Sequence, residues 1–210
     1  NDYYTPVYTT LSTAPVAAIF YNSLSTSITV RWENGASGSG FLTIPDKGSN
    51  SLLLSATAGY RFWTNNGTGP ITEANGSAFV AVSIIDADNS GGDYDWAFSL
   101  ISSERLTNYS SVAWAPGSSN LSANYNPMWV TPEANTTLYV KFDGQLGRTG
   151  SQISPCGVAY DVAIPISRLS GNRIFDTDND QSGMAIFTCD GVKVAATWGQ
   201  DAALAPVAGI

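Results

Sequence analysis

The sequence of 210 residues contains no histidine, two cysteines and few glutamates. Without histidine, Ser-His-Asp and Cys-His catalytic arrangements are impossible, and most zinc hydrolase sites are excluded with them. The glutamates stand alone in turn-like or polar stretches, which disfavours the paired carboxylates of a glycoside hydrolase. They are Glu33, Glu73, Glu104 and Glu133. No glycine-rich phosphate loop precedes a helix, so we expect a protein that is not an enzyme.

Charge is also scarce, because only 12% of the residues are charged and their formal sum is −8. A net negative chain is a poor partner for nucleic acid or an anionic membrane surface, but it suits cation binding and an extracellular location. No apolar run reaches the roughly 18 residues that a membrane-spanning helix needs. The chain begins at Asn1 with neither a start methionine nor a signal peptide, which is typical of a mature product or an excised fragment.

What the chain has in quantity is Ser, Thr, Asn and Gly between short apolar stretches. This composition favours strands and turns over helices. Apolar residues alternate with polar ones in many short segments, and no segment has a convincing helical period. The predicted strands are 15–21, 27–32, 40–45, 51–56, 78–85, 94–101, 111–115, 128–131, 137–142, 160–166, 184–189 and 192–198. We therefore predict an all-β fold, an antiparallel β-sandwich of immunoglobulin-like or jelly-roll-like type.

A stretch rich in Gly, Ser and Gln at 143–157 is the best candidate for a domain boundary. It predicts a main sandwich over 1–142 and a smaller β lobe over 143–210 packed on it, with one continuous domain as the alternative. The smaller lobe would be marginal on its core alone, and a lobe of that size usually needs cross-links. Both cysteines and a cluster of aspartates lie in it.

The cysteines, Cys156 and Cys189, predict one disulfide formed in an oxidising compartment. The alternative is a pair of buried free thiols. In the chain-entropy model a bridge closing a loop of this length stabilises the fold by about 3–4 kcal/mol.

The segment "TCDGVK" predicts a tight hairpin, because Asp190-Gly191 is a preferred two-residue turn between alternating strands. Counting from this turn pairs Cys189 with Val192 and Phe187 with Val194. All four side chains then share one face, which we expect to be the core side. The same register brings the loop that follows residue 175 to the end of the hairpin where Asp201 emerges.

The segment "FDTDNDQSG" sets Asp176, Asp178 and Asp180 at alternate positions. Carboxylates this close repel one another, and a calcium ion bound by them and by Asp201 would offset the repulsion with several hard oxygen ligands. The loop departs from an EF-hand, which requires glycine where Gln181 stands and glutamate where Phe187 stands. The alternative is a solvated acidic turn, since Asp, Asn and Gly are favoured turn residues.

A second acidic segment, "DADNSGGDYDW", separates two predicted strands. We expect its aspartates, Asp86, Asp88, Asp93 and Asp95, to form a further calcium site, with a solvated hairpin again as the alternative. Magnesium is less suitable because it retains its waters, and zinc is disfavoured by the lack of histidine and clustered cysteine.

Two stretches carry a resemblance: "VAVSIIDADNSGGDYDWAFSL" and "RIFDTDNDQSGMAIFTCDGVKVAATWGQD". They resemble segments of very large, multi-module bacterial surface and secreted proteins, which combine β-sandwich modules with repeated immunoglobulin-like or cadherin-like domains. The resemblance implies an extracellular location, calcium-stabilised β modules and a role in adhesion or in surface structures. By position it supports Asp176, Asp178, Asp180, Asp190 and Asp201 as polar residues worth testing.

These features favour an extracellular structural or adhesive module that builds a cell-surface fibre, coat or adhesin. Its partners would be further copies of the chain or neighbouring modules. Both ends of the sequence are apolar and uncharged over long stretches, so an end could add a strand to another copy; alternatively, each end completes its own sandwich. The other functional hypothesis is a calcium-dependent carbohydrate-binding module, with Trp63, Trp114 and Trp129 as exposed stacking residues, unless these aromatics pack inside the sandwich.

Overall fold

The computed structural model describes residues 2–5, 16–55, 58–64, 79–85, 96–113, 127–142, 150, 152–176 and 181–199. Within these ranges the chain consists of antiparallel β-strands and one short 3-10 helix, Ser103–Arg105. None of the helical structure in this part of the chain is long and apolar enough to cross a membrane. The predicted all-β, antiparallel sandwich fold is confirmed, and each predicted strand overlaps an observed one.

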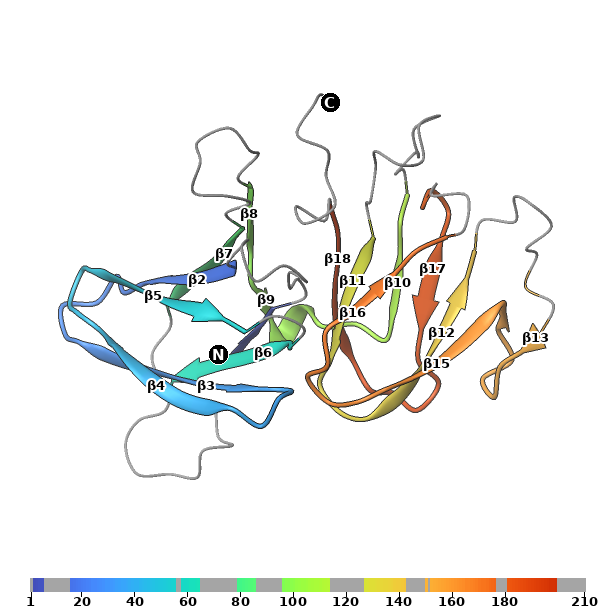
Figure 1. Cartoon of the computed structure of the whole chain (residues 1–210), viewed down its shortest axis with the longest axis horizontal. Helices are drawn as coiled ribbons and strands as arrows, with labels where there is room; N and C mark the ends of the chain where they lie inside the picture. Colours follow the sequence, from blue (N-terminus) through green and yellow to red (C-terminus); the bar gives the residue numbers. More distant parts are fainter. Residues whose placement is uncertain are drawn as a thin grey trace.

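The first half of the chain forms one sandwich of two sheets (Figure 1). One sheet has the strand order β4-β3-β6-β1-β9, and the other has the order β5-β2-β7-β8. The strands are β1 (Asp2–Tyr4), β2 (Val16–Tyr21), β3 (Ile28–Asn34), β4 (Ser39–Ile44), β5 (Ser49–Leu54), β6 (Tyr60–Thr64), β7 (Val80–Ile85), β8 (Trp96–Ser99) and β9 (Ile101–Ser102). Its core contains an aromatic group in which the Phe20 ring lies 5.0 Å from Phe62 and 5.8 Å from Phe79.

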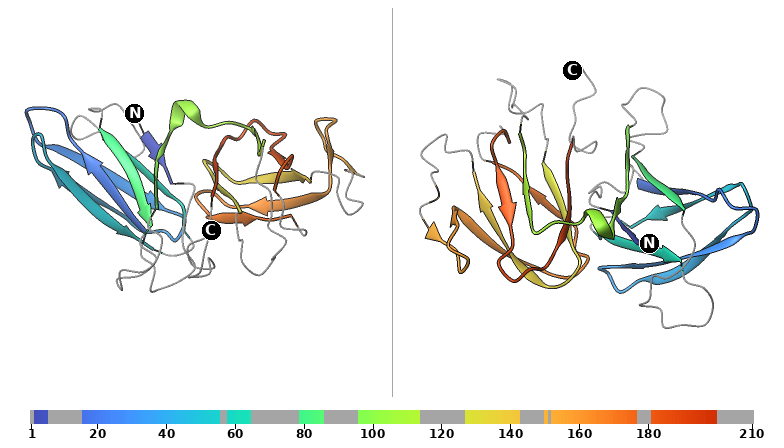
Figure 2. Two further views of the ribbon diagram at one scale, coloured as in Figure 1. Left: turned by 90° about the horizontal axis from the view of Figure 1, so that it is seen from above. Right: turned by 180° about the vertical axis from the view of Figure 1, so that it is seen from behind.

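The second half forms another sandwich, beside the first along the long axis of the molecule (Figures 1 and 2). A sheet with the order β10-β17-β12-β15 faces a sheet with the order β16-β11-β18, and β13-β14 is a small separate ribbon. The strands are β10 (Tyr109–Ser111), β11 (Met128–Pro132), β12 (Thr136–Lys141), β13 (Gln152–Ile153), β14 (Ala159–Tyr160), β15 (Val162–Ile166), β16 (Asn172–Ile174), β17 (Ala185–Phe187) and β18 (Val194–Trp198). Aliphatic side chains from both sheets fill its core, among them Val130, Leu138, Val140 and Ile186.

The sheets do not divide at the predicted boundary between 142 and 143. Strands β11 and β12 lie before this boundary, but their pairing partners lie after it. In the described part of the chain β11 pairs with β16 and β18, and β12 pairs with β15 and β17. The two cores are formed by residues up to 100 and by residues from 112 onward, with the 3-10 helix between them. The apolar alternation of 128–142 predicted strands correctly, but it carried no information about their distant partners.

The predicted hairpin at Asp190-Gly191 is also wrong. Strand β17 pairs with β10 and β12, whereas β18 pairs with β11 in the opposite sheet, so the turn carries the chain from one sheet to the other. Gly191 has the expected positive φ of 81°, but Asp190 does not, as a type I′ turn would require. Ile186 therefore faces the core, and Phe187 and Cys189 lie on the outer face of their sheet.

The two sandwiches meet at a turn between β15 and β16 whose central residue is Leu169. Leu169 is fully buried, has a φ of 55°, and packs in a cluster with Tyr4, Leu106 and Ala195. Its backbone N–H donates to the Pro132 carbonyl within its own sandwich at 2.9 Å. Its carbonyl accepts a hydrogen bond of 2.9 Å from the Gly59 N–H in the first sandwich.

Two glycines make this approach possible. A Cβ on Gly35 would lie 2.2 Å from the Leu169 carbonyl oxygen, and one on Gly59 would lie 2.4 Å from Thr131 Cγ2. Both distances are well inside van der Waals contact, so any side chain at either position would force the sandwiches apart. We call this contact, formed by Gly35, Gly59, Thr131 and Leu169, the glycine seam.

Replacing Gly59 by alanine is expected to lower the free energy of unfolding by about 1–3 kcal/mol, because the added methyl group overpacks the seam. Ser51→Ala, on an exposed position of β5, is the control and is expected to change it by less than about 0.5 kcal/mol. Chemical denaturation of both variants measures the difference. A Gly59→Ala protein as stable as the control would mean that the seam is not closely packed in solution.

Candidate functional site

The predicted calcium ligands fall almost entirely outside the described residues. Only Asp176 lies inside them; the others, Asp178, Asp180, Asp201, Asp86, Asp88, Asp93 and Asp95, do not. Among the residues that are described, no three acidic, cysteine or histidine side chains form a group able to hold a metal ion. Calcium binding therefore stays a prediction.

The structure does describe both ends of the first acidic loop. Asp176 is buried, and its backbone N–H donates a hydrogen bond of 2.7 Å to Oε1 of Gln181, which is also buried. Nε2 of Gln181 is buried without a hydrogen-bond partner within the described part of the chain. Beyond Gln181, the Gly183 N–H donates to the Val112 carbonyl at 2.7 Å. The residues on either side of 177–180 are thus held to each other and to the rest of the sandwich.

The strands that precede the loop 177–180 and residue 201 in the sequence lie in the same sheet. β16 and β18 flank β11 on opposite sides, and Ile174 and Trp198 are both in register with Met128. The chain leaves both strands at the same end of this sheet, about two strand spacings, or roughly 10 Å, apart. The hairpin that we expected to bring the two segments together does not form.

Two of the three predicted glycan-stacking tryptophans are buried. Trp63 and Trp129 each have 0% of their surface exposed, so they offer no platform to a ligand. The Arg61 guanidinium lies over the Trp63 ring at 4.9 Å, and Trp129 Nε1 donates to the Gly199 carbonyl at 3.0 Å. The alternative, that these aromatics pack inside the protein, is correct for both. Trp114 lies outside the described residues.

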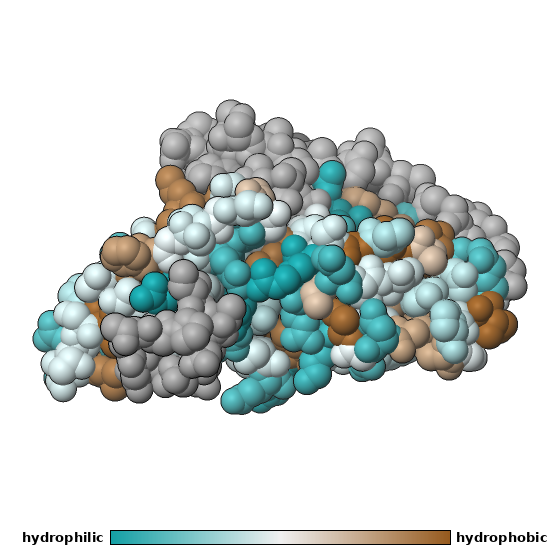
Figure 3. All heavy atoms as spheres, turned by 90° about the horizontal axis from the view of Figure 1, so that it is seen from below, coloured by the Kyte–Doolittle hydropathy of each residue, from teal (hydrophilic) through white to brown (hydrophobic). Residues whose placement is uncertain are grey.

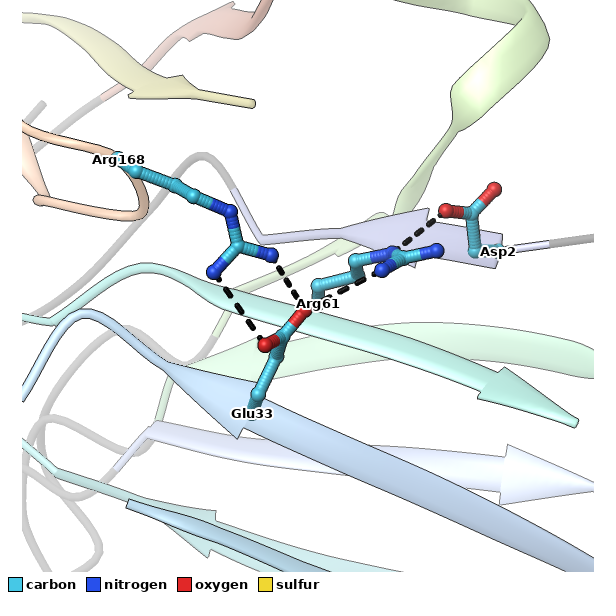
Figure 4. A network of polar contacts seen from close by, with 4 residues as sticks. All are labelled: Asp2, Glu33, Arg61 and Arg168. Atoms are coloured by element: carbon cyan, nitrogen blue, oxygen red, sulfur yellow. Dashed lines mark hydrogen bonds and ion pairs between the residues drawn. The ribbon is translucent and has the colours of Figure 1, made fainter. Parts of the chain in front are cut away.

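A network of charges runs along the junction of the sandwiches (Figure 4). Arg61 on β6 donates to Asp2 at 2.7 Å and to Glu33 at 3.2 Å, and Arg168 from the second sandwich donates to Glu33 through both terminal nitrogens. Burial alone would lower the pKa of Arg61, but its hydrogen bond to Asp2 and its charged neighbours raise it. Arg61 therefore stays charged and ties the first strand to the junction.

Figure 3, a view from below, shows hydrophilic side chains gathered between the two sandwiches and apolar ones in small separate patches. Within the network, Arg61 and Asp2 are largely shielded from solvent, whereas the Arg168 side chain is 43% exposed. An exposed pair of this kind contributes little to stability. The junction also contains the buried apolar cluster around Leu169.

The predicted disulfide is confirmed: Cys156 and Cys189 are bonded, with their Cα atoms 5.4 Å apart. The bridge lies on the outer face of the sheet β10-β17-β12-β15, where it holds the turn that carries Cys156 against the end of β17. Cys156 is exposed and Cys189 is half-buried. The bridge thus anchors a surface turn to the sheet and is not part of the core.

Aromatic side chains form a row beneath this turn. Tyr109, Phe187 and Tyr139 are in register on three adjacent strands, and the Phe187 and Tyr139 rings stack at 5.4 Å. The Tyr160 ring meets Tyr139 edge-on at 4.9 Å. Phe187 is buried, whereas Tyr109 is 54% exposed.

Sequence reasoning missed these tyrosines, because exposure on one face of a sheet depends on which strands cover it. The alternation of 137–142 and the nearby cysteine were the only signals that could have indicated them.

The chain matches no protein-family model, no curated protein and no solved structure.

Proposed function

We propose that this chain is an extracellular structural and adhesive module that joins copies of itself or neighbouring modules into a surface assembly, with calcium stabilising its acidic loops. The observation that carries this proposal is the glycine seam, at which two sandwiches share one buried cluster. A load-transmitting module needs such a fixed joint between its parts. Catalysis has no comparable support among the described residues.

The disulfide supports the proposed location. A stable bridge with one exposed cysteine persists in an oxidising compartment such as the cell exterior, and cytosolic reductants would open it. The chain has few lysine and arginine residues and a net charge of −8, so its charge disfavours binding to nucleic acid. This agrees with a location outside the cell.

The calcium part of the proposal rests on the fixed ends of the loop 177–180. Asp176 and Gln181 are hydrogen-bonded to each other, and the sequence places Asp178 and Asp180 between them. Carboxylates held close together raise the energy of the folded state unless a cation compensates their charge. In the proposed mechanism calcium acts as a clamp on this end of the sandwich and has no chemical role.

Chelation is expected to lower the melting temperature of the wild-type protein, because ligand at a hundredfold excess over its dissociation constant stabilises a fold by about 2.7 kcal/mol. Asp178→Ala should remove most of this calcium dependence. Asp46→Ala, which removes an equal charge from an exposed turn of the first sandwich, should leave it intact. Thermal melts of the three proteins with calcium and with chelator make the comparison. An equal chelator response in wild type and Asp178→Ala would contradict the assignment.

The outer face of the sheet β5-β2-β7-β8 supports self-association, because none of its described outward positions carries a charge. Leu53, Val80 and Tyr21 are the large exposed apolar side chains on this face, at 70%, 57% and 44% exposure. The register joins them to further uncharged neighbours: Ala17, Ile19, Ser49, Ser51, Val82, Ala97 and Ser99. In a chain with a net charge of −8, a second copy meets no like charge on this face.

Sedimentation velocity and negative-stain microscopy in calcium are expected to show concentration-dependent assemblies of the wild-type chain. Leu53→Glu should weaken association at least about tenfold, because it brings like charges together at a contact between identical faces. Phe41→Glu adds the same charge at an exposed position of the other sheet and is the matched control. A monomeric wild type, or equal association of both variants, would overturn the proposed role of this face.

A further inference from the structure

The turn held by the disulfide divides the aromatic outer face of the second sandwich into two hollows. On one side, a hollow of about 250 Å³ is lined by Asn108, Tyr109, Cys156, Val158, Phe187, Thr188 and Cys189. On the other side, a hollow of about 200 Å³ is lined by Thr137, Tyr139, Pro155, Cys189 and Asp190. The two hollows share Cys189, so they form one shallow surface on either side of a single bridge. We call it the disulfide saddle.

The shape of the saddle is fixed by contacts beneath and beside it. The Phe187 ring stacks on Tyr139, and the edge-on contact with Tyr160 fixes Tyr139 from the other side. The turn above them is closed by hydrogen bonds from the Ser154 N–H to the Val158 carbonyl and from the Val158 N–H to Ser154 Oγ, at 2.9 and 3.1 Å. A ligand therefore meets a surface that requires little ordering on binding.

The polar side chains of the saddle are the Asp190 carboxylate, the Asn108 carboxamide and the hydroxyl groups of threonine and tyrosine. The Asp190 carboxylate accepts from the Thr136 hydroxyl at 2.7 Å and from the Val192 N–H at 3.1 Å. The Thr136 hydrogen bond lowers the pKa of Asp190, so this carboxylate is ionised at neutral pH. A carboxylate has about four acceptor sites, which leaves capacity for a ligand hydroxyl.

The charge of the saddle limits the class of ligand. Among the described residues that line the two hollows there is no lysine or arginine, and Asp190 is the only charged one. Phosphates, nucleic acids and acidic polymers would meet an uncompensated negative charge here. A purely apolar ligand would leave the polar lining groups desolvated. A neutral ligand that has a flat apolar face and many hydroxyl donors suits both the exposed tyrosine ring and the acceptor groups.

We infer that the disulfide saddle binds a neutral saccharide. The exposed Tyr109 ring packs on the apolar face of one sugar ring, Tyr139 lines the neighbouring hollow, and Asp190 accepts hydrogen bonds from sugar hydroxyls. Tyrosine suits this role because it combines a flat apolar body with a polar tip. The inference names a ligand class for the adhesive part of the proposed function and rests on it, but it requires neither calcium nor self-association.

The test uses the Leu53→Glu chain in chelator, so that failure of the calcium or assembly proposals cannot affect it. Neutral hexasaccharides of glucose, mannose, galactose and xylose are titrated against labelled protein and followed by two-dimensional NMR. We expect at least one of them to shift resonances around Tyr109, Tyr139 and Asp190. Tyr109→Ala and Asp190→Asn should each weaken that binding at least tenfold.

Phe41→Ala is the control, because it removes an exposed aromatic ring from the first sandwich and should leave the affinity unchanged. Tyr109 is largely exposed, so its replacement is expected to leave the fold intact, and circular dichroism of the variant checks this. The inference is overturned if no hexasaccharide shifts the spectrum at millimolar concentration. It is equally overturned if the shifts lie elsewhere, if Tyr109→Ala binds as wild type, or if only a lysine-rich peptide binds at the saddle.

Discussion

The close contact between the Leu169 turn and two glycines is the constraint on which the rest of the molecule depends. The Leu169 carbonyl reaches the Gly59 N–H only because neither Gly35 nor Gly59 carries a side chain. This contact brings Tyr4 and Ala195 into one buried cluster and closes the space between two sandwiches that each have their own core. The two halves are thus joined by a buried apolar cluster, a close backbone contact and an ion pair.

The few charged residues are unevenly distributed over the described part of the molecule. Several of them lie at the junction, where Arg61 and Arg168 both bind Glu33 and so link the two sandwiches. The broad outer sheet of the first sandwich carries none at its described outward positions, and the outer face of the second is bridged by a disulfide over tyrosines. We propose that the first of these faces contacts further copies of the chain and that the second binds a neutral ligand.

Much of the fold could be predicted from the sequence, because alternating apolar residues and turn clusters act locally. Alternation failed where a strand is covered on both faces, as in β6 (Tyr60–Thr64), in which Arg61 is the only residue that is not fully buried. Asp190-Gly191 was read as a hairpin, since local turn chemistry cannot indicate that the flanking strands belong to opposite sheets. The candidate site could be predicted only through its disulfide; the exposure of Tyr109 and the burial of Trp129 depend on contacts between distant segments.

The most direct test of the shared seam is differential scanning calorimetry of the intact chain. If the sandwiches unfold as one body, the protein gives a single transition whose calorimetric enthalpy equals its van't Hoff enthalpy. Two resolved transitions, or a calorimetric enthalpy about twice the van't Hoff value, would show that each sandwich unfolds independently and would contradict the account.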